Sequence, residues 1–137
     1  MYPAEIVAPM TQDLLSVGFE ALETPQEVVD VLDNQSGTAL LVVNSVCGCA
    51  AAMARPGVKM ALQNSKHPEN LYTVFAGVDT DATSKAREFL LPYPPSSPAI
   101  ALFKDGRLVH FLERHHIEGR SAMMIAENLK AAFDEYC

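Results

Sequence analysis

The feature that most constrains this chain is an apolar run that leads directly into two closely spaced cysteines. Residues Thr38 to Val43 are β-branched or leucine-rich and do not alternate with polar residues, which is typical of a strand covered on both faces. Cys47, Gly48 and Cys49 follow, and the alanine-rich sequence after them favours a helix. A strand covered on both faces needs helices on both sides of its sheet, so the pattern predicts an α/β fold.

The rest of the chain carries the signals of further helices and strands. Five helices are expected. The first has Pro9 in its first turn and ends before Gly18, and the second begins at a capping box formed by Thr24 and Glu27. The third covers Ala50 to Asn64 with a kink near Pro56, the fourth covers Asp79 to Leu91, and the fifth begins after a Ser121 cap. Strands are expected over Leu71 to Ala76, Ala99 to Phe103 and Arg107 to Leu112, and Asp105-Gly106 between the last two is a strong hairpin signal.

The order of these elements predicts the topology. From Thr38 onward it is strand, helix, strand, helix, strand, strand, helix. A right-handed crossover makes the first two strands parallel and the hairpin makes the last two antiparallel, so a mixed sheet is covered by helices on both faces. This is the outline of a thioredoxin-like domain, with a core at residues 38–137 and a helical N-terminal extension at residues 1–37. At 137 residues, the chain is about one domain long.

Charge and composition exclude several classes of protein. Seventeen acidic residues against ten basic ones give a net charge of −7, and the bases are scattered, which argues against nucleic acid or anionic membrane as a partner. The longest uncharged stretch is too interrupted to cross a bilayer, and the first residues lack the features of a signal peptide. Three cysteines, two of them one residue apart, do not make a secreted disulfide framework. We therefore expect a cytoplasmic protein.

The cysteine pair is predicted to lie at a helix N-terminus, where unpaired amides and the helix dipole favour an anion. The pKa of the Cys47 thiol should therefore be lowered, while Gly48 leaves the turn open for the two sulfurs to approach. Because Asp and Glu are absent from Thr38 to Ala54, this activation is expected to come from the backbone. Cys47 is predicted to attack and Cys49 to resolve. A disulfide between them would be strained, and so better suited to clearing a mixed disulfide than to general reduction.

A C-x-C pair could also bind a soft metal ion. A closed zinc site needs four ligands, and His115 with His116 are the only available supplement. If these histidines lie on a strand they point to opposite faces, so we predict no bound metal. A thiophilic metal carrier remains the alternative from another class, and an interaction module without redox activity is a third.

Two further positions are candidates for the site. Ser97-Pro98 immediately precedes the strand that starts at Ala99, where a thioredoxin-like domain places a cis-proline facing the cysteines. The backbone of Ser97 would then pair with an extended segment of substrate. Cys137, the last residue, is expected to be an exposed thiol, with a third redox cysteine folding back toward Cys47 as the alternative.

Several motifs, taken together, resemble one family. They are Val42 to Ala51, Ala54-Arg55-Pro56, Phe75-Ala76-Gly77, Pro95-Ser96-Ser97-Pro98, and Arg114-His115 with Ile117-Glu118-Gly119. This set closely resembles the bacilliredoxins, thioredoxin-like proteins with C-G-C in place of C-x-x-C, over nearly the whole chain. Where typical members have Pro-Arg-His-Glu after the last strand, this chain has Glu113-Arg114-His115-His116.

The resemblance implies a thiol-disulfide oxidoreductase that removes a low-molecular-weight thiol, bacillithiol in the family's namesakes, from mixed disulfides on proteins. It implies that Cys47 attacks, Cys49 resolves and Pro98 is the cis-proline. Disulfide isomerase is the alternative activity. The expected co-substrate is bacillithiol or an equivalent thiol, with no other cofactor, and the expected partners are oxidised or S-thiolated proteins.

Overall fold

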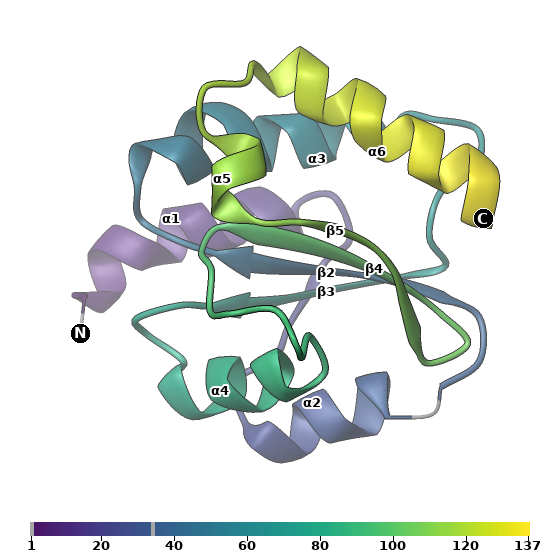
Figure 1. Ribbon diagram of the computed structural model, residues 1–137. Helices are drawn as coiled ribbons and strands as arrows, with labels where there is room; N and C mark the ends of the chain where they lie inside the picture. Colours follow the sequence, from purple (N-terminus) through teal and green to yellow (C-terminus); the bar gives the residue numbers. More distant parts are fainter. Residues whose placement is uncertain (1, 34) are drawn as a thin grey trace.

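A computed structural model describes residues 2–33 and 35–137 of the chain (Figure 1). The elements in chain order are α1 (Ala4–Leu15), β1 (Glu20–Ala21), α2 (Pro25–Leu32), β2 (Thr38–Asn44), the π-helix η1 (Ala50–Ala54), α3 (Arg55–Ala61), β3 (Asn70–Phe75), α4 (Thr80–Glu88), β4 (Ala99–Lys104), β5 (Arg107–Leu112), α5 (Arg114–Ile117) and α6 (Ala122–Tyr136). The strands form one sheet in the order β1-β3-β2-β4-β5. β2 and β3 are parallel, whereas β4 is antiparallel to both β2 and β5. The predicted mixed sheet is confirmed.

The central strand β2 is buried along its whole length. Leu40 and Val42 pack into one core beneath α1, α3, α5 and α6, while Leu41 and Val43 pack into a second core against α2 and α4. Figure 1 shows these two groups of helices on opposite faces of the sheet. The apolar run that lacked alternation is therefore a strand with two apolar faces, as predicted.

The structure confirms one turn and two helix caps that the sequence predicted. Asp105 and Gly106 both have positive φ, 51° and 79°, which is the geometry that an Asp-Gly hairpin turn of type I′ requires. Thr24 caps α2, and Glu27 completes the predicted capping box. Ser121 accepts a hydrogen bond at the start of α6.

Two helices differ from their predictions. α1 begins at Ala4, so Pro9 lies inside the helix rather than in its first turn; the helix former Ala4 and the buried Val7 extend it toward the N-terminus. The helix after the cysteines is not one kinked α-helix. It starts as η1 and continues as α3, with Pro56 in the first turn of α3, where its missing N–H is tolerated.

The N-terminal segment contributes a strand that the sequence analysis did not predict. β1 pairs in parallel with β3 through Glu20 and Ala21. A strand of two residues has no periodicity to recognise, and it exists because the edge of β3 is available for pairing. The segment before β2 is therefore part of the sheet as well as a pair of helices.

Within the part of the chain that the structure describes, no helix is both long and apolar enough to span a lipid bilayer.

Candidate active site

The cysteine turn lies at the C-terminal end of β2, directly before η1. The carbonyl oxygen of Cys47 accepts hydrogen bonds from the amides of Ala50 and Ala51, at 3.1 and 3.2 Å, and Cys49 is the N-cap of η1. The predicted position at a helix N-terminus is confirmed, although the first turn is π-helical. The amides of this turn are therefore oriented toward the cysteines.

Side-chain and backbone hydrogen bonds set the acidity of Cys47. Burial alone would raise the pKa of the Cys47 thiol, but the hydroxyl of Ser45, the amides of Ala50 and Cys49 and the neighbouring Cys49 thiol together lower it. The sequence analysis predicted the same direction, a lowered pKa for Cys47. The predicted cause was incomplete, because the Ser45 side chain contributes more than any backbone group.

Cys49 behaves in the opposite way. Burial and the nearby Cys47 sulfur raise the pKa of the Cys49 thiol, and Arg114 opposes that rise only in part. Once Cys47 carries a negative charge, a second anion beside it is disfavoured. The turn therefore makes one thiol more acidic than the other, although both are half-buried.

The space around Gly48 is open. A Cβ built on Gly48 would meet no atom of the described chain within 4 Å, so solvent or a substrate can reach the middle of the turn. Cys47, Cys49 and Cys137 are all free thiols in the structure.

Arg114 contacts the segment before β4 and also acts electrostatically on the cysteines. The Ser97-Pro98 peptide bond is cis, as predicted, and Pro98 is buried. The Arg114 guanidinium donates to the carbonyl oxygen of Ser97 at 3.2 Å, and the Arg114 amide donates to the Ser96 hydroxyl at 2.6 Å. The positive charge of Arg114 also acts on both cysteines, and their thiolate charges in turn raise its pKa, after the larger effect of Glu118. Arg114 therefore connects the Ser97-Pro98 segment to the redox pair.

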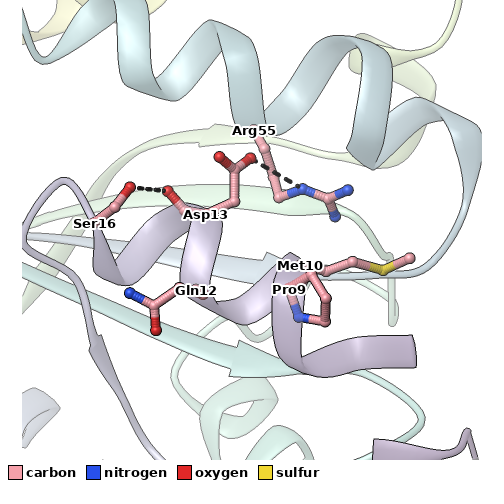
Figure 2. A pocket seen from close by; sticks show the side chains of 6 residues that line it. All are labelled: Pro9, Met10, Gln12, Asp13, Ser16 and Arg55. Atoms are coloured by element: carbon pink, nitrogen blue, oxygen red, sulfur yellow. Dashed lines mark hydrogen bonds and ion pairs between the residues drawn. The ribbon is translucent and has the colours of Figure 1, made fainter. Parts of the chain in front are cut away.

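Sequence reasoning missed a buried polar cluster beneath the cysteine turn. Arg55 is only 5% exposed, and its Nη1 donates to Asn44 Oδ1 and to the Ser45 carbonyl oxygen, both at 2.9 Å. Asp13 of α1 lies beside the same guanidinium, with 3.6 Å between Oδ2 and Nε (Figure 2). Ala54-Arg55-Pro56 is one of the motifs that carry the family resemblance, but nothing in the sequence indicates that this arginine is buried.

The placement of His115 and His116 differs from the prediction. They lie on the single turn α5, not on a strand, and their ring centroids are 4.0 Å apart. Strand β5 ends at Leu112 because Glu113 is the N-cap of α5. The amide of Glu113 donates a hydrogen bond to His116 Nδ1 at 3.0 Å. Glu113 Oε2 also lies 3.1 Å from His115 Nε2, so these three side chains form a compact group. With Nδ1 accepting a hydrogen bond, a neutral His116 carries its proton on Nε2 and offers a donor there.

Cys137 lies far from the redox pair. It is close to Thr38 at the start of β2, whereas Cys47 follows the end of that strand. A strand of seven residues spans roughly 20 Å at about 3.3 Å per residue. The alternative in which Cys137 folds back toward Cys47 is therefore excluded in this structure.

The chain is similar to known proteins over nearly its full length. The family model described as Disulphide isomerase matches residues 2–137. A bacilliredoxin of Cytophaga hutchinsonii is 62% identical over 98% of this chain and 99% of its own. A bacilliredoxin of Halalkalibacterium halodurans is 48% identical over 99% of this chain and 94% of its own.

Solved structures show the fold independently. The thioredoxin of Fasciola hepatica superposes with a TM-score of 0.58 at 15% identity, covering 86% of this chain and 99% of its own. The predicted thioredoxin-like fold is confirmed. This fold, together with the named relatives, makes the chain a thiol-disulfide oxidoreductase. By its match over nearly its full length, the chain belongs to the bacilliredoxin family.

Proposed function

We propose that this protein removes a low-molecular-weight thiol, bacillithiol or an equivalent, from mixed disulfides on client proteins. The observation that carries the proposal is the difference between the two thiols of the turn: the pKa of Cys47 is lowered and that of Cys49 is raised. At neutral pH, Cys47 is then the better source of thiolate, and Cys49 remains protonated until the first exchange has occurred.

The chemistry runs in two exchanges that conserve electrons. The Cys47 thiolate attacks the sulfur of the small thiol, forming a Cys47 mixed disulfide and releasing the client cysteine as a thiolate, which takes a proton from water. Cys49 then loses its proton and attacks Cys47 Sγ, which forms the Cys47–Cys49 disulfide and releases the small thiol. An external dithiol or two monothiols must supply two electrons to restore the pair.

The Ser97-Pro98 segment is proposed to receive the substrate. Ser97 and Pro98 precede β4, and Arg114 joins this segment to the turn through its bond to the Ser97 carbonyl oxygen. The space beside Gly48 is open to an extended client segment, and we propose that the backbone of Ser97 pairs with that segment. These contacts would align the disulfide of the substrate with Cys47.

Disulfide isomerase activity is a second candidate, because the matching family model carries that description. Isomerisation needs an attacking thiolate that forms a mixed disulfide with the client, and a client thiol then displaces it. It does not require Cys49 to resolve the intermediate. The dependence on Cys49 therefore separates the two activities.

The arrangement of potential metal ligands supports a metal-carrier role less than it supports thiol-disulfide exchange. In residues 2–33 and 35–137, the one group of three closely spaced potential ligands is Glu113, His115 and His116, and it contains neither redox cysteine. A thiophilic ion at Cys47 and Cys49 would thus have two protein ligands, fewer than a closed zinc site requires.

The test uses a client protein that carries a bacillithiol mixed disulfide, with a glutathione mixed disulfide in parallel. Mass spectrometry follows the loss of the small thiol. Cys47→Ser should abolish the reaction, and Cys49→Ser should accumulate a mixed disulfide between Cys47 and the small thiol. Removal that continues without Cys47 would refute the proposal, while refolding of a scrambled client by Cys49→Ser at the wild-type rate would favour the isomerase.

A further inference from the structure

The guanidinium of Arg55 is a charge buried in the interior, directly behind the redox turn. Its residue is 5% exposed, and the Nε atom has no hydrogen-bond partner within the described chain. Removing a charged group from water costs several kcal/mol unless partners compensate. Burial accordingly lowers the pKa of Arg55, whereas the charges of Asp13 and Cys47 oppose that effect. An interaction with a nearby anion is therefore expected to offset the cost of burying this arginine.

The contacts of Arg55 are concentrated on the residues that lead into the turn. Nη1 bonds both Asn44 Oδ1 and the Ser45 carbonyl oxygen. Asn44 Oδ1 also accepts from the Ser45 amide at 2.9 Å, and the Ser45 hydroxyl accepts from the Cys47 amide at 3.2 Å. One continuous set of bonds thus links the guanidinium to the nucleophile.

The neutralisation of Arg55 is incomplete. Its acidic neighbour is Asp13, but the Nε to Oδ2 distance of 3.6 Å is too long for a hydrogen bond. Asp13 instead accepts a bond of 2.6 Å from Lys59, and its side chain is 36% exposed to screening solvent. Part of the positive charge of Arg55 is therefore left to act on the sulfur of Cys47.

Helix α1 forms the other side of this arrangement. The carbonyl oxygen of Met10 accepts a bond of 3.2 Å from Asn44 Nδ2, so α1 contacts the same turn through its backbone. A surface pocket of about 510 Å³ opens beside it, lined by Pro9, Met10, Gln12, Asp13, Ser16 and Arg55 (Figure 2). Asp13 and Arg55 both line this pocket, so α1 places a carboxylate beside the buried guanidinium.

We propose that Arg55 is a positioning residue of the redox site: its buried charge stabilises the Cys47 thiolate and fixes the Asn44–Ser45 turn, and Asp13 of α1 limits how much of that charge the sulfur experiences. This inference rests on the proposed role of Cys47 as the nucleophile. Among the described residues, Arg114 and Glu118 also act on the pair, from the side of α5. Arg55 acts from the interior instead.

The test measures the alkylation rate of Cys47 against pH by mass spectrometry in four variants. Arg55→Met should slow alkylation at pH 7 about threefold, because an opposite charge that acts on the thiolate is lost. Arg55→Lys should restore most of the rate. Asp13→Asn should accelerate alkylation about twofold, since the charge of Arg55 is then less neutralised.

The control is Arg87→Met. Arg87 lies on α4, on the opposite face of the sheet. The residue is half-buried, and its Nε, like that of Arg55, is buried without a partner in the described chain, so the substitution removes an equal charge far from the cysteines. It should leave the alkylation of Cys47 unchanged.

Two results would overturn the inference: a rate for Arg55→Lys as low as that for Arg55→Met, or a slower rate for Asp13→Asn. If Arg55→Met does not fold, the direction of the Asp13→Asn change decides alone. Because alkylation requires no client, these results stand apart from the test of small-thiol removal. Loss of turnover in Cys47→Ser tests that function without involving Arg55.

Discussion

The amide of Cys47 donates a hydrogen bond to the hydroxyl of Ser45 at 3.2 Å, and the same hydroxyl is the largest of the groups that lower the pKa of the Cys47 thiol. Ser45 is 8% exposed, so its hydroxyl acts with little competition from water. A single small side chain between β2 and the cysteines thus holds the turn by accepting one bond and stabilises the thiolate by donating another.

Replacing Ser45 by Ala should raise the pKa of Cys47. A hydrogen bond to a charged group contributes about 1.5 kcal/mol, so the thiolate present at pH 7 should fall roughly tenfold. Alkylation of Cys47 at pH 7 measures this directly. Ser84→Ala, at an exposed position on α4, is the matched control and should have no effect; an equal rate in the two variants would show that the Ser45 hydroxyl does not activate the sulfur.

Replacing Arg114 by Gln should lower kcat/KM for client proteins while the protein still folds. The change removes the bond to the Ser97 carbonyl oxygen and a positive charge that acts on both cysteines. Because Arg114 lowers the pKa of Cys49, that thiol should ionise at higher pH in the variant. Steady-state kinetics should show roughly a tenfold loss of kcat/KM. Arg107→Gln, at the start of the edge strand β5, controls for the lost charge, and the account fails if both variants lose equal activity.

Two glycines of the site region should respond differently to alanine. A Cβ at Gly57 would lie 2.7 Å from Ile125 Cγ2, between α3 and α6, whereas one at Gly48 meets no described atom within 4 Å. Gly57→Ala should therefore lower the free energy of unfolding by about 1 to 3 kcal/mol, as overpacking does. Gly48→Ala should leave it within about 0.5 kcal/mol of wild type. Urea denaturation measures both, and equal stabilities would contradict the close packing of α3 on α6.

Replacing Cys137 by Ser should leave small-thiol removal unchanged. The thiol lies beside Thr38, at the end of β2 opposite the redox turn, and burial raises its pKa. It is thus both distant from Cys47 and a weak source of thiolate. Peptide mapping of the oxidised wild-type protein should show Cys47 linked to Cys49, and an intramolecular Cys47–Cys137 disulfide would contradict the placement of the C-terminus.

The sequence predicted the parts of this molecule that depend on local signals. The unalternating run from Thr38 required two covered faces, the Asp105-Gly106 pair required positive φ, and Thr24 required a cap, and each signal acts over a few residues. These elements place the cysteines at a strand-to-helix junction. The position of the redox pair therefore followed from local pattern.

The parts that were missed depend on tertiary contacts. Arg55 is buried because Asn44, Ser45 and Asp13, which come from two other parts of the chain, meet its guanidinium. β1 exists because the edge of β3 receives it. Neither partner set can be read from neighbouring residues. The contribution of Ser45 is a different case: it lies only two residues before Cys47, but the expectation of backbone activation rested on the absence of acidic residues and did not consider a hydroxyl.

The central claim is that the turn selects Cys47 as the thiolate. The most direct measurement is the pH dependence of alkylation at Cys47 and at Cys49 in the reduced wild-type protein, followed separately by mass spectrometry. The account predicts a midpoint for Cys47 below the value of about 8.5 for a free cysteine, and below that of Cys49. A Cys47 midpoint at or above the free value, or ionisation of Cys49 first, would contradict it.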